Sequence, residues 1–165
     1  MGSVETVALA MQTVLKTVAN RAAKRTGFQQ RQSKLTGSAF VRGLVFGWLS
    51  KPQATLEELA QAIAAGGVTI STQGLDQRFT PQAAALLKDV LEAATGAVVA
   101  TSPGATEILD RFTAVYVADS TVIALPNALR AVWPGCGGSH GPSAGLKVQV
   151  CMDYKAGGLQ LSLHP

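Results

Sequence analysis

Cysteine and long apolar runs are both scarce in this sequence, and each scarcity excludes a class of protein. Cys136 and Cys151 are the only cysteines among 165 residues, so the chain has no dense disulfide framework and fits a reducing compartment. No stretch is long and apolar enough to cross a membrane. The amino-terminal residues include Glu5 and lack a cationic start ahead of a hydrophobic core, unlike a signal peptide. These features predict a cytoplasmic protein with no membrane partner.

Zinc ligands are sparse as well. Cys136, His140 and Cys151 are residue types that bind zinc, but there is no paired C-x-x-C, and a fourth ligand would have to be the distant His164. Cys151 falls inside an apolar strand pattern, which favours a small core residue. The sequence gives only weak support to a zinc site.

Acidic residues are absent from one long segment, between Lys16 and Lys51. The cationic residues of this segment are Lys16, Arg21, Lys24, Arg25, Arg31, Lys34, Arg42 and Lys51. The whole chain has a net charge of +4 at pH 7. A polyanion would be attracted to such a segment, with an affinity that falls as the salt concentration rises. The alternative is a solvated basic helix face.

Hydrophobic residues make up 47% of the chain, enough to bury a core, and their spacing in the first half is helical. The predicted helices run over about 4–24, 38–49, 55–63 and 71–78, and from 81 to at least 91. Thr55 and Ser71 are predicted N-caps. Gly43 and Gly47 lie one turn apart, which would let another helix approach closely. The predicted buried faces of two of these helices contain Leu56, Leu59, Ala60 and Ile63, and then Leu86, Leu87, Val90 and Leu91.

The segment from Thr55 to Phe79 resembles a helix-turn-helix, with a helix, a glycine turn and a short polar helix. In that module the first residues of the second helix enter the major groove of DNA. Thr72, Gln73, Gln77 and Arg78 would then reach bases or phosphates, since Gln pairs with adenine and Arg with guanine. The alternative is an ordinary helical corner that binds no DNA.

A run of apolar and β-branched residues over 115–126 contains a single carboxylate, that of Asp119. This pattern predicts a buried strand with Asp119 where the strand leaves the sheet. A carboxylate held there suits Mg²⁺, which prefers hard oxygen ligands. The alternative is that Asp119 only caps the following turn. A helical turn is predicted over 126–132, and two further strands, joined by a turn, over 146–152 and 159–163.

Two segments, VADSTVIALPNALRAVWPGCGG and AGLKVQVCMDYKAGGLQLSL, resemble the start of the catalytic domain of insertion-sequence transposases of the DDE class. The features that carry the resemblance are the DST step at Asp119, Leu125-Pro126, Trp133-Pro134-Gly135, Lys147, the turn from Asp153 to Gly157 and the strand from Leu159 to Leu163. Upstream, RQSKLTGSAFVRGLVFGWL and TISTQGLDQRFTPQAAALLKDVL resemble the family's helical amino-terminal region. The resemblance extends from about Phe28 to the end of the chain.

The resemblance implies an α+β fold, with a helical amino-terminal region followed by the first strands of a truncated RNase H-like sheet. Residues 1–94 would form the helical, DNA-binding-like region. Residues 95–112 would form a linker with a short helix from about 106 to 112. The small and glycine-bearing stretch 94–103 favours a boundary there. Residues 113–165 would begin the catalytic domain.

The resemblance also implies a function, the binding of transposon ends as double-stranded DNA, followed by strand cleavage and transfer with two Mg²⁺ or Mn²⁺ ions. Asp119 would be the catalytic carboxylate and a metal ligand. A homo-oligomer is a further expected partner. The expected DNA-binding residues are Arg21, Lys24, Arg25, Arg31, Lys34, Arg42, Thr72, Gln73, Gln77 and Arg78.

One departure from the family pattern limits these expectations. The family's active site needs a second Asp and a Glu, but Asp153 is the only acid after Asp119. We therefore expect a truncated product or a fragment with weak or no catalysis by itself. Two alternatives stay open: a DNA-binding remnant without catalysis, and a helical structural or interaction protein in which Asp119 is structural.

Overall fold

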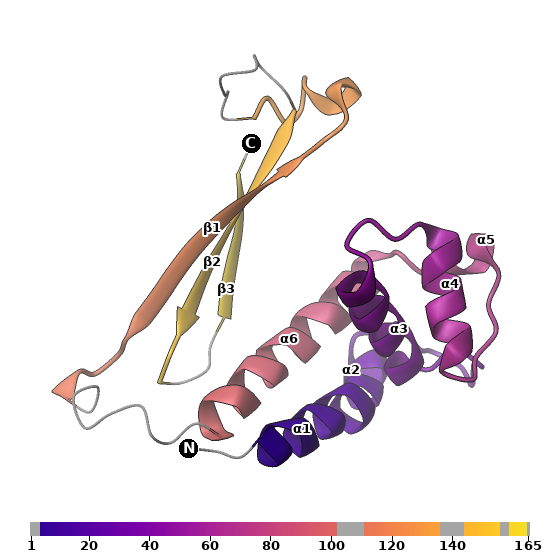
Figure 1. Cartoon of the computed structure of the whole chain (residues 1–165), viewed down its shortest axis with the longest axis horizontal. Helices are drawn as coiled ribbons and strands as arrows, with labels where there is room; N and C mark the ends of the chain where they lie inside the picture. Colours follow the sequence, from indigo (N-terminus) through magenta and orange to yellow (C-terminus); the bar gives the residue numbers. More distant parts are fainter. Residues whose placement is uncertain (1–3, 102–110, 136–143, 156–158, 165) are drawn as a thin grey trace. The chain divides into compact units, whose positions relative to one another are not determined.

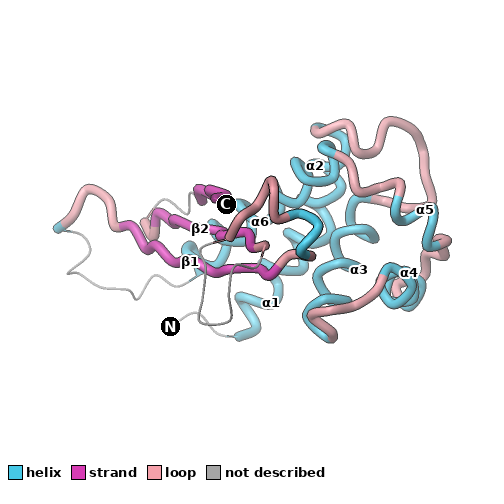
Figure 2. Tube along the Cα trace, turned by 90° about the horizontal axis from the view of Figure 1, so that it is seen from above, coloured by secondary structure: helices cyan, strands magenta, loops and turns pink. Residues whose placement is uncertain are grey.

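The chain divides after Ser102 into two compact units, Met1–Ser102 and Pro103–Pro165. We call them the helical unit and the strand unit. The computed structural model describes residues 4–101, 111–135, 144–155 and 159–164 (Figure 1). Helices form the first unit, and three strands with a short helical turn form the second (Figure 2). The predicted α+β class, helical first and then a sheet, is confirmed.

The helical unit begins with one long helical rod, which the periodicity predicted. A π-helical turn interrupts the rod in its middle, and the apolar pattern gave no sign of it. The elements of this unit are α1 (Val4–Thr13), the π-helical turn η1 (Val14–Val18), α2 (Ala19–Arg25), α3 (Gly37–Ser50), α4 (Leu56–Ala65), α5 (Thr72–Asp76) and α6 (Pro81–Thr101).

Ser38 fixes the start of α3 to this rod. Its hydroxyl donates a hydrogen bond to the Leu15 carbonyl at 2.7 Å, and its backbone N–H donates to Asn20 Oδ1 at 2.8 Å. Gly37 makes the close approach possible, because a Cβ there would lie 2.4 Å from the Cβ of Ala23. Since Ser38 is buried, both bonds replace water that its polar groups lose on folding.

Gly43 and Gly47 allow α3 and α4 to pack closely, as their spacing predicted. A Cβ at Gly43 would lie 2.1 Å from Ile63 Cγ1, and one at Gly47 would lie 2.7 Å from Leu59 Cδ2. Side chains essentially never approach so closely, so a larger residue would either force the two helices apart or displace the Ile63 or Leu59 side chain.

Helices α4 and α5 begin at the predicted N-cap residues, Thr55 and Ser71. Thr55 accepts a hydrogen bond from the Glu58 N–H, and the Glu58 carboxylate accepts one from the Thr55 N–H at 2.7 Å, which completes a capping box. Ser71 caps α5 in the same way, through the Gly74 N–H at 3.0 Å. Thr36, which the sequence reasoning missed, caps α3.

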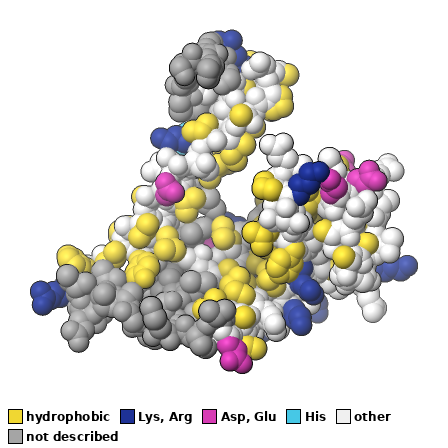
Figure 3. Space-filling model, in the orientation of Figure 1, with side chains coloured by type: hydrophobic (Ala, Val, Ile, Leu, Met, Phe, Trp, Pro, Cys, Tyr) yellow, Lys and Arg dark blue, Asp and Glu magenta, His cyan; other side chains and the backbone are white. Residues whose placement is uncertain are grey.

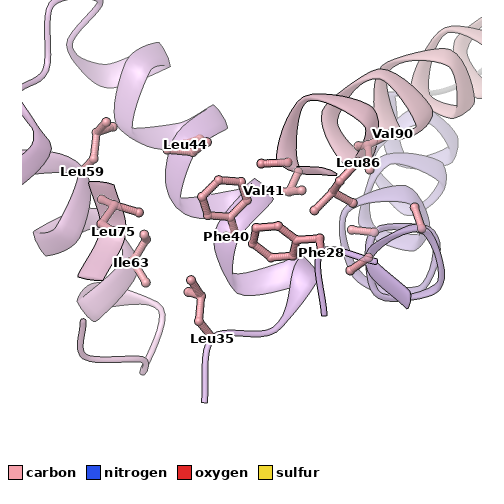
Figure 4. Packing of buried hydrophobic residues seen from close by; sticks show 14 of the residues in the cluster. Phe28, Leu35, Phe40, Val41, Leu44, Leu59, Ile63, Leu75, Leu86 and Val90 are labelled. Atoms are coloured by element: carbon pink, nitrogen blue, oxygen red, sulfur yellow. The ribbon is translucent and has the colours of Figure 1, made fainter. Parts of the chain in front are cut away.

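Phenylalanines from three segments contact one another at the core, where Phe28 and Phe40 are buried and Phe79 is 43% exposed at the edge. The ring centroids of Phe28 and Phe40 lie 4.7 Å apart, and those of Phe40 and Phe79 lie 6.0 Å apart in an edge-on arrangement. Figure 4 shows the Phe28 and Phe40 rings next to each other, with Leu86 and Val90 of α6 close by. Such aromatic pairs add to the free energy gained by burial.

Three predictions for the helices need correction. Leu56 and Leu91 were expected in the core but are 36% and 44% exposed: Leu56 is the first residue of α4, and Leu91 lies at the edge of the buried face of α6. Residues 95–101, expected to belong to the linker, are helical because α6 continues to Thr101, whereas the division between the units after Ser102 falls within the expected stretch 94–103. Ala94 and Ala97 pack against the core. This packing outweighs the cost of about 1 kcal/mol that an isolated glycine imposes on a helix.

The strand unit contains an antiparallel sheet of order β1-β2-β3. Tyr116 pairs with Asp153 and Ala124 with Gly145 across the first two strands, and Met152 pairs with Leu159 across the next two. The elements are β1 (Tyr116–Ala124), the 3₁₀ turn η3 (Asn127–Leu129), β2 (Gly145–Asp153) and β3 (Leu159–His164). The predicted strands and helical turn are confirmed, whereas most of the helix expected over 106–112 lies outside the described residues.

Two expectations for β1 are wrong. Asp119 lies inside the strand, because β1 continues to Ala124 before the chain leaves the sheet. The strand is also exposed along its whole length, with Tyr116 67% and Val122 58% exposed. Among the described residues no strand pairs with the outer edge of β1. Figure 3 shows hydrophobic side chains at the surface along the strand unit.

Candidate nucleic-acid interface

The predicted cationic residues are exposed, except Arg78, which is half-buried. They come from α2, from the connection between α2 and α3, and from α3 itself. On α2 they are Arg21, Lys24 and Arg25, in the connection Arg31 and Lys34, and on α3 Arg42. Their charges are thus available to an anion, although exposure alone also fits a solvated basic face.

Arg25 differs from its neighbours because it has a partner within the protein. Its Nη2 lies 2.7 Å from Oδ2 of Asp89 on α6. This ion pair links α2 to α6 and neutralises part of the Arg25 charge. A phosphate would have to compete with Asp89, so Arg21 and Lys24 are better placed to bind an anion through α2.

The predicted helix-turn-helix is present only in outline. Helices α4 and α5 follow each other, but the connection over 66–71 is longer than the roughly three- or four-residue turn of the motif. Helix α5 has 5 residues, little more than one turn. Thr72 and Gln73 are exposed in that turn, where an ordinary recognition helix would have its base-reading residues.

The helix expected to continue through Arg78 ends earlier. The Arg78 N–H bonds to the Leu75 carbonyl at 2.9 Å, and the Phe79 N–H bonds to the Asp76 carbonyl at 3.0 Å. These short-range bonds turn the chain so that the Phe79 ring, although 43% exposed, packs edge-on against Phe40, and α6 begins immediately afterwards. Gln77 and Arg78 therefore lie on a corner between two helices.

This corner forms one wall of a groove of about 510 Å³ in the helical unit. Residues 27–33, from the connection after α2, form the other wall. We call it the glutamine–arginine groove, because its polar side chains include Gln30, Arg31, Gln32, Gln77, Arg78 and Gln82. The residues that line it include no Asp or Glu. The sequence-predicted residues Arg31, Gln77 and Arg78 are thus brought together, although they are far apart in the chain.

Both walls of the groove are anchored to the same core residue, Phe40. Phe28 belongs to the first wall and Phe79 follows Arg78 in the second, and both rings pack on Phe40. The guanidinium carbon of Arg78 lies 6.0 Å from the centre of the Phe28 ring, a cation–π contact that joins the walls directly. The groove is therefore held in shape by the core of the helical unit.

Several groove residues were missed by the sequence reasoning. Gln29, Gln30 and Gln32 lie within two residues of Arg31 in the sequence. This run of amides next to a cation could have indicated a polar binding segment. Gln82 had no such signal, because only the fold places it here. A Cβ added to Gly27 would lie 4.0 Å both from Gln30 Nε2 and from Gln82 Cγ.

Other predicted residues lie outside the groove. Lys34, Thr72 and Gln73 are not among its lining residues. Arg42 lines a different depression, with Phe46 of α3 and Ile63 of α4. Lys24 lines a depression that also includes residues 29–32, so its charge lies next to the groove. The predicted DNA-binding set is thus distributed over more than one surface.

Among the described residues of the strand unit, Asp119 and Asp153 are the acids, and they lie apart. Its Oδ1 accepts a hydrogen bond from the Ser120 N–H at 2.7 Å. Asp153 pairs with Tyr116 rather than with Asp119, so it lies three residues, or about 10 Å, further along the sheet and on its opposite face. Within the described residues no group of three or more His, Cys, Asp or Glu side chains could hold a metal ion. These residues alone therefore do not form a divalent-metal centre.

The weak zinc hypothesis gains no support. Cys136 and His140 lie outside the described residues. Cys151 is a half-buried free thiol in β2, at a strand position as predicted. Among the described helices, none is long and apolar enough to cross a membrane.

Comparison with known proteins finds several transposases. The chain is 30% identical over 139 residues to the transposases for insertion sequence elements IS231B and IS231C of Bacillus thuringiensis subsp. berliner. It is 28% identical over 142 residues to that for IS231D of Bacillus thuringiensis subsp. finitimus. The first two alignments cover 82% of this chain and 28% of each relative, so the chain spans little more than a quarter of their length. No family model and no solved structure matches the chain.

Proposed function

This chain belongs to the insertion-sequence transposases, and we propose that its helical unit binds duplex DNA at transposon ends. The observation that carries the proposal is the cationic surface between α2 and α3, together with the similarity to transposases. The segment from Lys16 to Lys51 holds cations and no acid. Its exposed charges would neutralise phosphates and release counterions from the duplex.

The strand unit contributes a second part of the proposed function. Asp119 supplies one carboxylate to a DDE-type site on an RNase H-like sheet, and Mg²⁺ or Mn²⁺ bound there would supply the charge that assists strand cleavage and transfer. The antiparallel order β1-β2-β3 is compatible with the start of such a sheet. One carboxylate does not hold two metal ions, so the proposed site needs further carboxylate ligands besides Asp119. By itself the chain binds DNA without cutting it.

DNA binding by the helical unit is tested with the full chain and a duplex, by equilibrium titration across a series of salt concentrations. We expect the affinity to fall steeply with salt. Replacing Arg21 and Lys24 by glutamine should weaken binding and flatten the slope of log K against log salt by about 0.9 for each lost phosphate contact. Arg25→Gln should have a smaller effect, because Asp89 already occupies that guanidinium. Equal affinities of all variants at every salt concentration would disprove the proposal.

The role of Asp119 is tested in a relative that carries a complete active site. Asp119→Asn, made at the corresponding position, should abolish strand cleavage and leave duplex binding intact, because a neutral amide oxygen attracts a divalent cation much less strongly than a carboxylate does. A relative that still cleaves at its normal rate after this change would remove Asp119 from the catalytic site. The two tests are independent, since one measures binding and the other cleavage.

A further inference from the structure

The inference drawn here rests on the proposed function and concerns the part that the glutamine–arginine groove plays in binding DNA. We infer that this groove binds the sugar–phosphate backbone of one strand of duplex DNA, in a manner that does not depend on the base sequence. Arg31 and Arg78 pair with phosphates from opposite walls, and the glutamine amides donate hydrogen bonds to phosphate and sugar oxygens. The groove, rather than helix α5, is thus the main contact of this surface with DNA.

The shape of the site favours the DNA backbone over the base edges. Reading bases in the major groove needs an element that protrudes, such as a helix. Helix α5 has only 5 residues and stands beside a concave surface. A concave surface fits a convex ligand, and the sugar–phosphate ridge is the convex part of a duplex. The groove of about 510 Å³ is open to solvent, so the phosphates on the outside of a duplex can approach its lining residues.

The chemistry of the lining is selective for an anion that also accepts hydrogen bonds. The groove has guanidinium groups on both walls and no carboxylate among its lining residues. Asp76 is the nearest acid in sequence to Gln77, and it lies outside the groove lining. Gln30, Gln32 and Gln82 have exposed amides that donate without adding charge. Such neutral donors, mixed with Arg, are typical partners of phosphate and sugar oxygens.

The groove is preorganised, so little ordering is needed when DNA binds. Phe28 and Phe79 fix the two walls to Phe40, and the Gln29 N–H bonds to the Ala23 carbonyl at 2.9 Å. Arg78 is held over the Phe28 ring, which limits the rotamers of its side chain. Binding to fixed groups loses less conformational entropy than binding to mobile ones. An ordinary polar surface loop would not be anchored in this way.

The inference is tested by titrating the full chain with several duplexes of unrelated sequence, at a series of salt concentrations. Gln30→Ala with Gln82→Ala should weaken binding to every duplex by the same factor, about fivefold for each lost hydrogen bond, and leave the salt slope unchanged. Arg31→Ala should weaken binding and reduce the slope by about 0.9. Gln61→Ala on α4 and Arg130→Ala in the strand unit are matched controls outside the groove, and both should bind like the unaltered chain.

Three outcomes would overturn the inference. If the groove variants bind like the unaltered chain while Arg21 and Lys24 still matter, DNA binds elsewhere on the helical unit and the proposed function survives. If the glutamine variants lose affinity for only one duplex sequence, the groove reads bases and not the backbone. If the unaltered chain shows no salt-dependent affinity, the groove inference and the proposed DNA binding both fail. Unchanged thermal unfolding of each variant shows that a lost affinity is not a loss of folding.

Discussion

At the residue scale, Gly43 sets how closely α3 approaches α4. Gly43→Ala would place a methyl group 2.1 Å from Ile63 Cγ1, so the helices must separate or Ile63 must leave its rotamer. We expect the free energy of unfolding of the helical unit to fall by about 1–3 kcal/mol, as in other overpacked cores. Urea unfolding followed by circular dichroism measures this change.

Gly96→Ala is the matched control for Gly43→Ala. Gly96 also lies in a helix, α6, but nothing lies within 4 Å of a Cβ added there. Alanine at that position should stabilise the helix by up to about 1 kcal/mol, because it lowers the backbone entropy lost on folding. If the two substitutions change stability by the same amount and in the same direction, close helix packing is not the reason for Gly43.

Glu58 makes the stability of the helical unit depend on acid pH. A hydrogen bond from Lys51 and then those from the backbone and hydroxyl of Thr55 lower the pKa of Glu58 from 4.5 to about 2. Because the pKa is lower in the folded chain, the carboxylate stabilises the fold above about pH 4.5, and this contribution is lost as the pH falls from there towards 2. The difference in unfolding free energy between the unaltered chain and Glu58→Gln should shrink over that range. A difference that stays constant from pH 7 to pH 2.5 would contradict this linkage.

At the scale of the elements, local chemistry was sufficient where a helix begins. Thr55 and Ser71 were predictable as caps, because a hydroxyl that accepts a hydrogen bond from the first turn needs no distant partner. The strands that contain Lys147 and Leu159 were also predictable, from the alternation of apolar and polar residues and from the glycine turns that flank them. In each case the signal is contained within a few neighbouring residues.

Elements that depend on tertiary contacts were predicted less well. The end of α5 is set by Phe79 packing on Phe40, and the length of α6 by alanines that pack on the core. The predicted burial of β1 failed for a related reason, since an apolar strand is buried only where another layer covers it. Asp119 could be predicted as a lone acid in a strand, but its position five residues before the strand's end could not.

Several residues of the groove could be predicted from the sequence, but their meeting in one place could not. Arg31 was predicted to bind DNA as part of the cationic segment, and Gln77 and Arg78 as residues of a recognition helix that does not form as expected. Their meeting in one groove depends on two separate chain segments and on the aromatic contacts beneath them. Gln82 had no signal in the sequence and lines the groove only because the fold places the start of α6 there.

At the scale of the whole molecule, the two units differ in how they are stabilised. The helical unit has a continuous core that includes Phe40, Leu44 and Leu86, all fully buried. The strand unit exposes β1 throughout and leaves the outer edge of that strand unpaired among the described residues. Edges of this kind tend to pair with other chains. We therefore expect amide hydrogens in the helices to exchange with solvent more slowly than those of 115–117.

Amide hydrogen exchange of the full chain, with and without duplex DNA, is the most direct test of where DNA binds. The exchange of each amide is followed by mass spectrometry at low and at high salt. We expect the duplex to slow exchange in residues 27–33 and 77–82 at low salt, and this protection to disappear at high salt as the phosphate contacts are lost. Exchange in β1, β2 and β3 should not change. Protection confined to the strands, or no protection at any salt concentration, would contradict DNA binding by the helical unit.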